Sequence, residues 1–153
     1  MFIVSSALSS GGVAFEKYAR WPAGGVFITG AHQLIGTYSD LRRFQQFDRN
    51  YFGWHAHHIV ESQDLDRLGV SHLFPPRDQQ ICVLLPERAH IGRINSVLRN
   101  QNPTNVRATT NELLRAYQDA YALVGDYCGG GEANIRKELM AIVSVIFRMA
   151  GLH

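Results

Sequence analysis

The stretch that decides both the fold and the chemistry of this chain is Trp54-His55-Ala56-His57-His58-Ile59-Val60-Glu61. Side chains alternate between the two faces of a strand, so adjacent imidazoles at the start of an apolar strand point in opposite directions. One imidazole can then hold a metal ion while its neighbour takes a proton from water. We therefore expect different roles for His57 and His58.

A second apolar stretch, Ile81-Cys82-Val83-Leu84-Leu85, ends at Pro86. Its length and continuous apolar character predict a buried strand, and proline favours the first turn of a helix. We expect this helix to run to about Leu98. His90 lies one turn ahead of Ile94, which predicts that its imidazole faces the same side as the core contacts of the helix.

The order of these features resembles the HNH, or ββα-metal, nuclease motif. A strand with His-His is followed by a loop, an apolar strand, a proline and a helix that carries a histidine. The sequence is most similar to the bacterial polymorphic toxin nucleases marked by Ala-His-His or Gly-His-His. The resemblance covers residues 54–99. It implies an α+β fold, a mostly helical domain built around a ββα-metal motif.

The resemblance also implies a chemistry, the metal-dependent hydrolysis of phosphodiester bonds in nucleic acid. It assigns His58 as the general base, and His57 and His90 as ligands of one divalent metal ion. Imidazole suits zinc and nickel better than magnesium, yet related nucleases use magnesium, so Mg, Zn, Ni and Mn all stay open. Gln80 stands where the family usually has Asn, and its amide is expected to orient the base or to pin the loop.

The chain departs from the family pattern in the helix. Ala89 adds one residue between Pro86 and His90, and Ile94 replaces the further histidine of colicin-type DNases. Asn95 is polar but is expected to lie off the ligand face by helix geometry. The metal is then held by two histidines and water, or with an acid from elsewhere. The nearest acids in the sequence are Glu61, Asp64 and Asp66.

Several of these residues also have structural interpretations. His57 and His58 can be structural residues, and a histidine such as His90 is by itself more often a surface or satisfied core residue. Arg88 and Arg93 can clamp phosphate, but a solvated helix face explains them equally well. Simpler roles are expected for three other side chains. Trp54 is expected to anchor the core, and His55 and His72 to lie at the surface or contact phosphate.

Composition limits the class of protein. With 153 residues, 46% of them hydrophobic and 18% charged, the chain has the size and make-up of one folded domain. Its formal charge of +2 is too small for a polycation that coats DNA, although 13 of its 15 basic residues are arginine. Arginine grips phosphate through two hydrogen bonds, but a GC-rich genome explains the bias equally well. Cys82 is expected in the core.

The remaining segments predict helices and short strands, as follows. Residues 1–53 are expected to be irregular or helical, residues 54–99 to form the ββα core, and residues 100–153 to form a C-terminal helical part of the same domain. The predicted elements outside the motif are a strand at 25–29, a helix capped by Ser39 or Asp40 that runs to about Phe47, a helix at 62–68 stopped by Gly69, and helices at 104–124 and 132–149. No secretory signal and no membrane span are expected.

The leading functional hypothesis is an endonuclease of low sequence specificity, acting on DNA rather than RNA by resemblance alone. It would be the toxic C-terminal domain of an antibacterial effector, secreted or delivered into the cytoplasm of a target cell. A cognate immunity protein is the expected partner, with no membrane partner. The alternative is a catalytically impaired HNH-like module that binds nucleic acid or protein. The deaminase and zincin signatures, His-x-Glu with Pro-Cys-x-x-Cys and His-Glu-x-x-His, are absent from the sequence.

Overall fold

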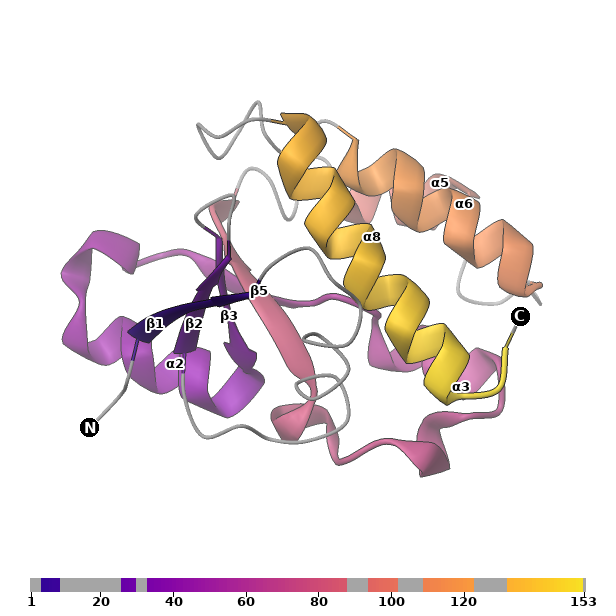
Figure 1. The fold of residues 1–153 in the computed structure, drawn as a ribbon, viewed down its shortest axis with the longest axis horizontal. Helices are drawn as coiled ribbons and strands as arrows, with labels where there is room; N and C mark the ends of the chain where they lie inside the picture. Colours follow the sequence, from indigo (N-terminus) through magenta and orange to yellow (C-terminus); the bar gives the residue numbers. More distant parts are fainter. Residues whose placement is uncertain are drawn as a thin grey trace.

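The chain is an α+β protein, here described from a computed structural model. The structure describes residues 4–8, 26–29, 33–87, 94–101, 109–122 and 132–152. A sheet of five strands separates helix α2 from a second group of helices, α5, α6 and α8 (Figure 1). The predicted fold class is therefore confirmed at the level of α+β.

The sheet has the strand order β1-β2-β3-β5-β4. Its members are β1 (Val4–Leu8), β2 (Val26–Thr29), β3 (Leu34–Thr37), β4 (His55–His58) and β5 (Ile81–Leu85). Strands β1 and β2 are parallel, and all other neighbours are antiparallel. Every residue of β5 is buried, which explains its unbroken apolar sequence, because helices cover both of its faces. Strand β4 is the last in this order and carries the His-His pair.

The described helices connect and cover these strands. They are α2 (Tyr38–Phe47), α3 (Ser62–Arg67), α5 (Ser96–Gln101), α6 (Thr110–Tyr121) and α8 (Glu132–Met149), with 3₁₀ turns η1 (Arg49–Tyr51), η2 (Ser71–Leu73) and η3 (Arg77–Gln79). Figure 1 shows α6 and α8 side by side over one face of the sheet. The turns η2 and η3 lie in the connection between β4 and β5, and η3 passes next to α2.

Two apolar cores occupy the two faces of the sheet. Val83 and Leu85 pack with α5, α6 and α8, whereas Cys82 and Leu84 pack with α2. In the β4–β5 register His57 pairs with Val83 and His58 with Cys82. The two imidazoles therefore face opposite cores, as the alternation of side chains predicts.

Most predicted elements outside the motif are confirmed. The strand β2, the end of α3 at Gly69 with its φ of 74°, and the bounds of α8 agree with the sequence pattern. Helix α6 was predicted to span residues 104–124 and is observed at Thr110–Tyr121, and residues 102–108 and 123–131 lie outside the described residues. For the helix after Pro86, Glu87 and residues 94–101 are helical, and residues 88–93 lie outside the described part.

The start of α2 differs from the prediction. Thr37 caps this helix, because its hydroxyl oxygen accepts the backbone N–H of Asp40 at 3.1 Å. Ser39 and Asp40 lie inside the first turn, so the expectation that one of them is the cap is wrong. Threonine is favoured both in strands and at helix N-caps. The sequence pattern alone therefore does not show that Thr37 ends β3 and also caps α2. Phe47, the last residue of α2, is 76% exposed.

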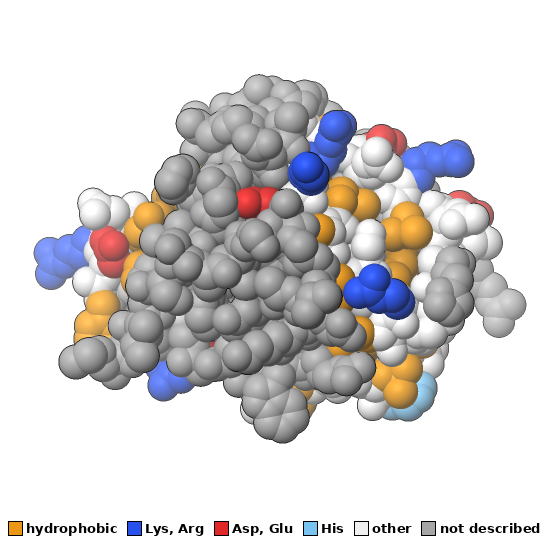
Figure 2. All heavy atoms as spheres, viewed as in Figure 1, with side chains coloured by type: hydrophobic (Ala, Val, Ile, Leu, Met, Phe, Trp, Pro, Cys, Tyr) orange, Lys and Arg blue, Asp and Glu red, His pale blue; other side chains and the backbone are white. Residues whose placement is uncertain are grey.

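The described basic side chains do not form one patch on the face shown in Figure 2. The Lys and Arg side chains drawn in blue lie at several separate places on that face. Within the described ranges, no helix combines the length and apolar character that crossing a membrane requires.

Candidate active site

His58 is held by one well-defined hydrogen bond. Its Nε2 atom lies 2.8 Å from the carbonyl oxygen of Arg77 in η3. A carbonyl only accepts, so Nε2 carries a proton and the neutral ring has its lone pair on Nδ1. No described residue bonds to Nδ1, and the ring stacks on Tyr38 with a centroid distance of 5.4 Å. The geometry thus fixes which nitrogen of His58 can accept a proton.

The environment of His58 also keeps its imidazole neutral. Burial is the largest influence and lowers the pKa of His58 below the ordinary value of 6.5. The hydrogen bond to the Arg77 carbonyl acts in the opposite direction, and the charge of Arg77 lowers the pKa further. At neutral pH His58 is therefore a base with an available lone pair, which is the state that general-base catalysis needs.

Gln80 fixes the loop that holds His58. Its Nε2 donates to the carbonyl of Pro75 at 3.0 Å, and its Oε1 accepts the hydroxyl of Ser62 at 2.9 Å. These bonds join the two ends of the segment 75–80 to the start of α3, and the Arg77 carbonyl lies within that segment. Of the two roles expected for Gln80, these bonds correspond to pinning the loop, and no hydrogen bond among the described residues joins Gln80 directly to His58.

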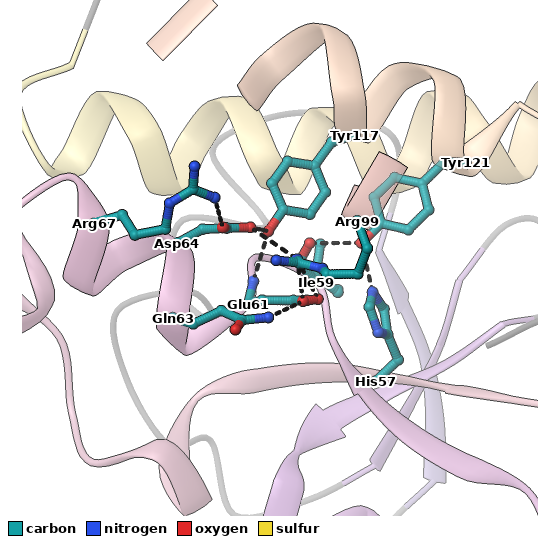
Figure 3. Close-up of polar contacts among 9 residues, drawn as sticks. All are labelled: His57, Ile59, Glu61, Gln63, Asp64, Arg67, Arg99, Tyr117 and Tyr121. Atoms are coloured by element: carbon teal, nitrogen blue, oxygen red, sulfur yellow. Dashed lines mark hydrogen bonds and ion pairs between the residues drawn. The ribbon is translucent and has the colours of Figure 1, made fainter. Parts of the chain in front are cut away.

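His57 belongs to a chain of hydrogen bonds on the other face of β4. The hydroxyl of Tyr121 donates its single proton to the carbonyl of Ile59 at 2.6 Å. The contact of 2.9 Å between Nε2 of His57 and the same hydroxyl is therefore one in which His57 donates (Figure 3). Neutral His57 then has its lone pair on Nδ1, so any metal it binds is bound through that atom.

Tyr117, one turn before Tyr121 in α6, belongs to a second buried hydrogen-bond network. The hydroxyl of Tyr117 donates to Oδ2 of Asp64 and accepts the backbone N–H of Glu61 at 2.8 Å. Asp64 is fully buried and also pairs with Arg67 at 3.0 Å. Figure 3 shows Tyr117 and Tyr121 reaching from one helix toward the segment that follows β4. Asp64 is thus committed to the protein's own side chains.

Glu61 lies between this network and the solvent. Its carboxylate accepts two hydrogen bonds from Arg99, at 2.7 and 3.2 Å, and one from Gln63 at 2.8 Å. Burial raises the pKa of Glu61 above its usual value of 4.5, against the opposing effects of Gln63 and Arg99. The Arg99 guanidinium also lies 3.9 Å from the Asp64 carboxylate, so it is close to two negative charges.

A cleft of about 460 Å³ brings several of these residues together. Both histidines of the pair line it, since β4 is the last strand of the described sheet and the cleft runs beside it. Its remaining lining residues are Ala56, Glu61, Ser62, Gln63, Asp66, Arg77 and Asn95. Of the three acids proposed as further ligands, Glu61 and Asp66 reach the cleft.

Asn95 corrects an expectation about the helix after Pro86. It was expected to lie off the ligand face, but it lines the same cleft as His57 and His58. Residues 94 and 95 are π-helical, and the larger number of residues per turn in a π-helix changes the angles between successive side chains. Ile94 is fully buried in the core with α6 and α8.

The expected metal site is described only in part. His90, Arg88 and Arg93 lie outside the described residues. Among the residues that are described, no three His, Cys, Asp or Glu side chains gather as a metal site would require. His57 and the carboxylates of Glu61 and Asp66 line the same cleft, but the described side chains do not by themselves make up a metal site.

The other singled-out residues have simpler positions. Trp54 is half-buried and packs edge-on against Tyr51 at 5.0 Å, within the core under α2, as predicted for an anchor. Cys82 is buried in the same core, as predicted. His72 is exposed in η2, and His55 is half-buried at the start of β4.

Three contributors to the site were not foreseen from the sequence. They are the phenols of Tyr117 and Tyr121 and the backbone carbonyl of Arg77. The two tyrosines were recognised only as apolar positions of a helix, although a buried tyrosine hydroxyl needs a polar partner, and this was the available signal. A backbone carbonyl leaves no trace in the sequence.

Comparison with family models, with curated proteins and with solved structures found no match to this chain.

Proposed function

We propose that the chain is a metal-dependent endonuclease that hydrolyses phosphodiester bonds. The observation that carries this proposal is His58, a buried, neutral imidazole whose Nε2 is fixed by a backbone carbonyl and whose Nδ1 holds the lone pair. Such a group, in a cleft beside a second histidine, is suited to remove a proton from water.

The order of elements supports the ββα-metal interpretation. Strands β4 and β5 pair antiparallel, and a helical segment that includes α5 follows β5 in the chain. The first strand carries both histidines, and the expected position of His90 falls between β5 and α5. These relations agree with an HNH-like core at residues 54–99 in a single domain spanning 1–153.

In the proposed reaction Nδ1 of His58 accepts a proton from the attacking water. The Arg77 carbonyl keeps the ring oriented, and Gln80 keeps the Arg77 segment in place. His57, through Nδ1, and His90 would hold one divalent ion. A bound ion of this kind neutralises charge on the scissile phosphate and the leaving oxygen. Arg88 and Arg93 remain the proposed phosphate contacts.

The biological setting is proposed from the sequence resemblance. The chain would act on DNA with low sequence specificity, as the toxic domain of an effector delivered to the cytoplasm of a target cell. A small immunity protein would neutralise it. An adjacent gene whose product binds this chain and blocks cleavage would support this setting.

Cleavage of supercoiled plasmid tests the enzymatic proposal. Purified protein is incubated with Mg, Mn, Zn or Ni, and with chelator as the control. We expect His58→Ala to abolish cleavage while retaining metal affinity, and His57→Ala and His90→Ala to weaken both. His72→Ala, at an exposed histidine away from the cleft, is the matched control and should cleave normally.

The alternative is an HNH-like module that binds nucleic acid or protein without cleaving it. The replacement of a second helical histidine by Ile94 favours it, because Ile94 is buried in the core and has no ligand atom. An absence of cleavage with every metal, combined with retained plasmid binding, would favour this alternative.

A further inference from the structure

A second cleft lies beside β4, at the opposite end of the strand from His58. Its volume is about 560 Å³, and α2, the turn after it and the start of β4 line it. Trp54 and His55 belong to this cleft, and the next three residues of the same strand belong to the cleft with the histidine pair. At about 3.3 Å per residue, the strand joins Trp54 to His58 over roughly 13 Å.

The lining of the second cleft is positively charged. Arg42 and Arg49 are exposed there, and the described residues that line it include no Asp or Glu. Neither guanidinium forms an ion pair with a described residue, in contrast to Arg43, which pairs with Asp40 at 2.8 Å. Arg42 donates instead to the neutral amide of Gln45. Two exposed arginines that form no ion pair with a described residue favour an anionic ligand.

An exposed aromatic ring stands beside these arginines. The side chain of Phe52 is 87% exposed, at the turn between η1 and β4. The amide of Gln45 donates to the carbonyls of Tyr51 and Trp54, at 2.8 and 2.6 Å, so both ends of the turn are tied to α2. Phe52 is thus presented to the solvent by a fixed turn.

We propose that the second cleft binds an unpaired segment of nucleic acid next to the cleaved bond. Arg42 and Arg49 would contact phosphates, and Phe52 would stack on a base. Arginines that follow a backbone and an aromatic ring open to a base are the two elements of single-strand binding. The distance along β4 is one that a few nucleotides of an unpaired strand can span. The inference rests on the proposed function in taking nucleic acid as the ligand.

Fluorescence anisotropy with a short labelled single-stranded DNA oligonucleotide tests the site. The measurement is made in chelator, so binding is read without cleavage. We expect Phe52→Ala to weaken binding about tenfold, the range of one stacked base. Arg42→Gln and Arg49→Gln should each weaken it and lower the slope of log affinity against log salt by about one.

Two control variants remove an exposed arginine or an exposed apolar side chain outside the second cleft. Arg115→Gln removes an exposed arginine of α6, and Leu73→Ala removes an exposed apolar side chain of η2. Both should bind as the parent does. Circular dichroism of all variants checks that each is folded.

The outcomes separate this inference from the proposed function. Parent-like binding by Phe52→Ala, Arg42→Gln and Arg49→Gln would overturn the inference. Tighter binding of a duplex than of its single strand would overturn it as well. An inability of the folded parent chain to bind any oligonucleotide would overturn it too. Selective loss of binding in the cleft variants supports it, even if no metal gives cleavage, in which case only the catalytic proposal fails.

Discussion

The Nε2 atom of His57 lies 2.9 Å from the phenolic oxygen of Tyr121, a residue 64 positions later in the chain. Because Tyr121 donates its own proton to the Ile59 carbonyl, it can only accept from the imidazole. Helix α6 thereby determines which nitrogen of His57 holds the lone pair. Helix α6, which lies outside residues 54–99, thus determines part of the surroundings of His57 and does more than enclose the core.

Replacing Tyr121 with Phe should loosen this arrangement. The substitution leaves the His57 N–H and the Ile59 carbonyl without their buried partner, at a cost of about 2 kcal/mol. We expect the free energy of unfolding, measured with urea, to fall by that amount. Affinity for the activating metal should also fall, because either nitrogen of the ring can then carry the proton.

Tyr51→Phe is the control for this variant, since Tyr51 is half-buried and its ring contacts are aromatic. It should change neither quantity appreciably. If Tyr121→Phe binds metal as tightly as the parent, Tyr121 has a purely structural role.

The sequence predicted the parts of the fold that follow from apolar periodicity. Strand β5 and helix α8 each carry a pattern that only one local structure can bury, so their bounds were close. The start of α2 was misplaced because Thr37, the last residue of β3, is also its cap. One residue serving two elements is not visible in a periodicity.

For the site, the sequence predicted which residues share a strand but not what holds them. Alternation along β4 placed His57 and His58 on opposite faces. Their partners come from a backbone carbonyl in η3 and a phenol in α6, and both depend on tertiary packing. Asp64, Asp66 and Glu61 were equivalent in the sequence, and their burial and hydrogen-bond partners distinguish them in the structure.

The pH dependence of cleavage should reflect the lowered pKa of His58. The base works when neutral, so activity falls as His58 takes up a proton. Because burial moves the pKa below 6.5, kcat/KM should be level down to about that pH and fall only below it. An acidic limb centred above 6.5 would argue against His58 as the base.

The same shift predicts a change in stability. Below pH 6.5 the unfolded chain binds a proton at His58 more readily than the folded chain does. The contribution of neutral His58 is therefore present above 6.5 and is lost as the pH falls through its folded pKa. Urea unfolding of parent and His58→Gln over this range should show a smaller loss of stability on acidification in the variant, if both remain folded.

Gln80→Ala should slow cleavage, although Gln80 is not one of the proposed substrate contacts. It removes the bonds to Pro75 and Ser62, so the segment that bears the Arg77 carbonyl loses its attachment to α3. We expect faster amide hydrogen exchange in residues 75–80, a stability loss of about 1–2 kcal/mol, and a lower kcat with a little-changed KM. Gln79→Ala, at the exposed neighbour, is the control. Unchanged exchange together with a lower kcat would point to direct contact with the reaction.

The last prediction separates the two aspartates near the cleft. Asp64 is buried against Tyr117 and Arg67, so Asp64→Asn removes a carboxylate charge that pairs with a mostly buried guanidinium. We expect a loss of about 3 kcal/mol in the free energy of unfolding, with metal affinity retained in the folded fraction. Asp66 is exposed and lines the cleft, so Asp66→Asn should leave stability unchanged and reduce metal affinity if this acid completes the site. Isothermal titration with Mn and with Zn measures the affinity of both variants. A large loss of affinity in folded Asp64→Asn would contradict its assignment to the structural network.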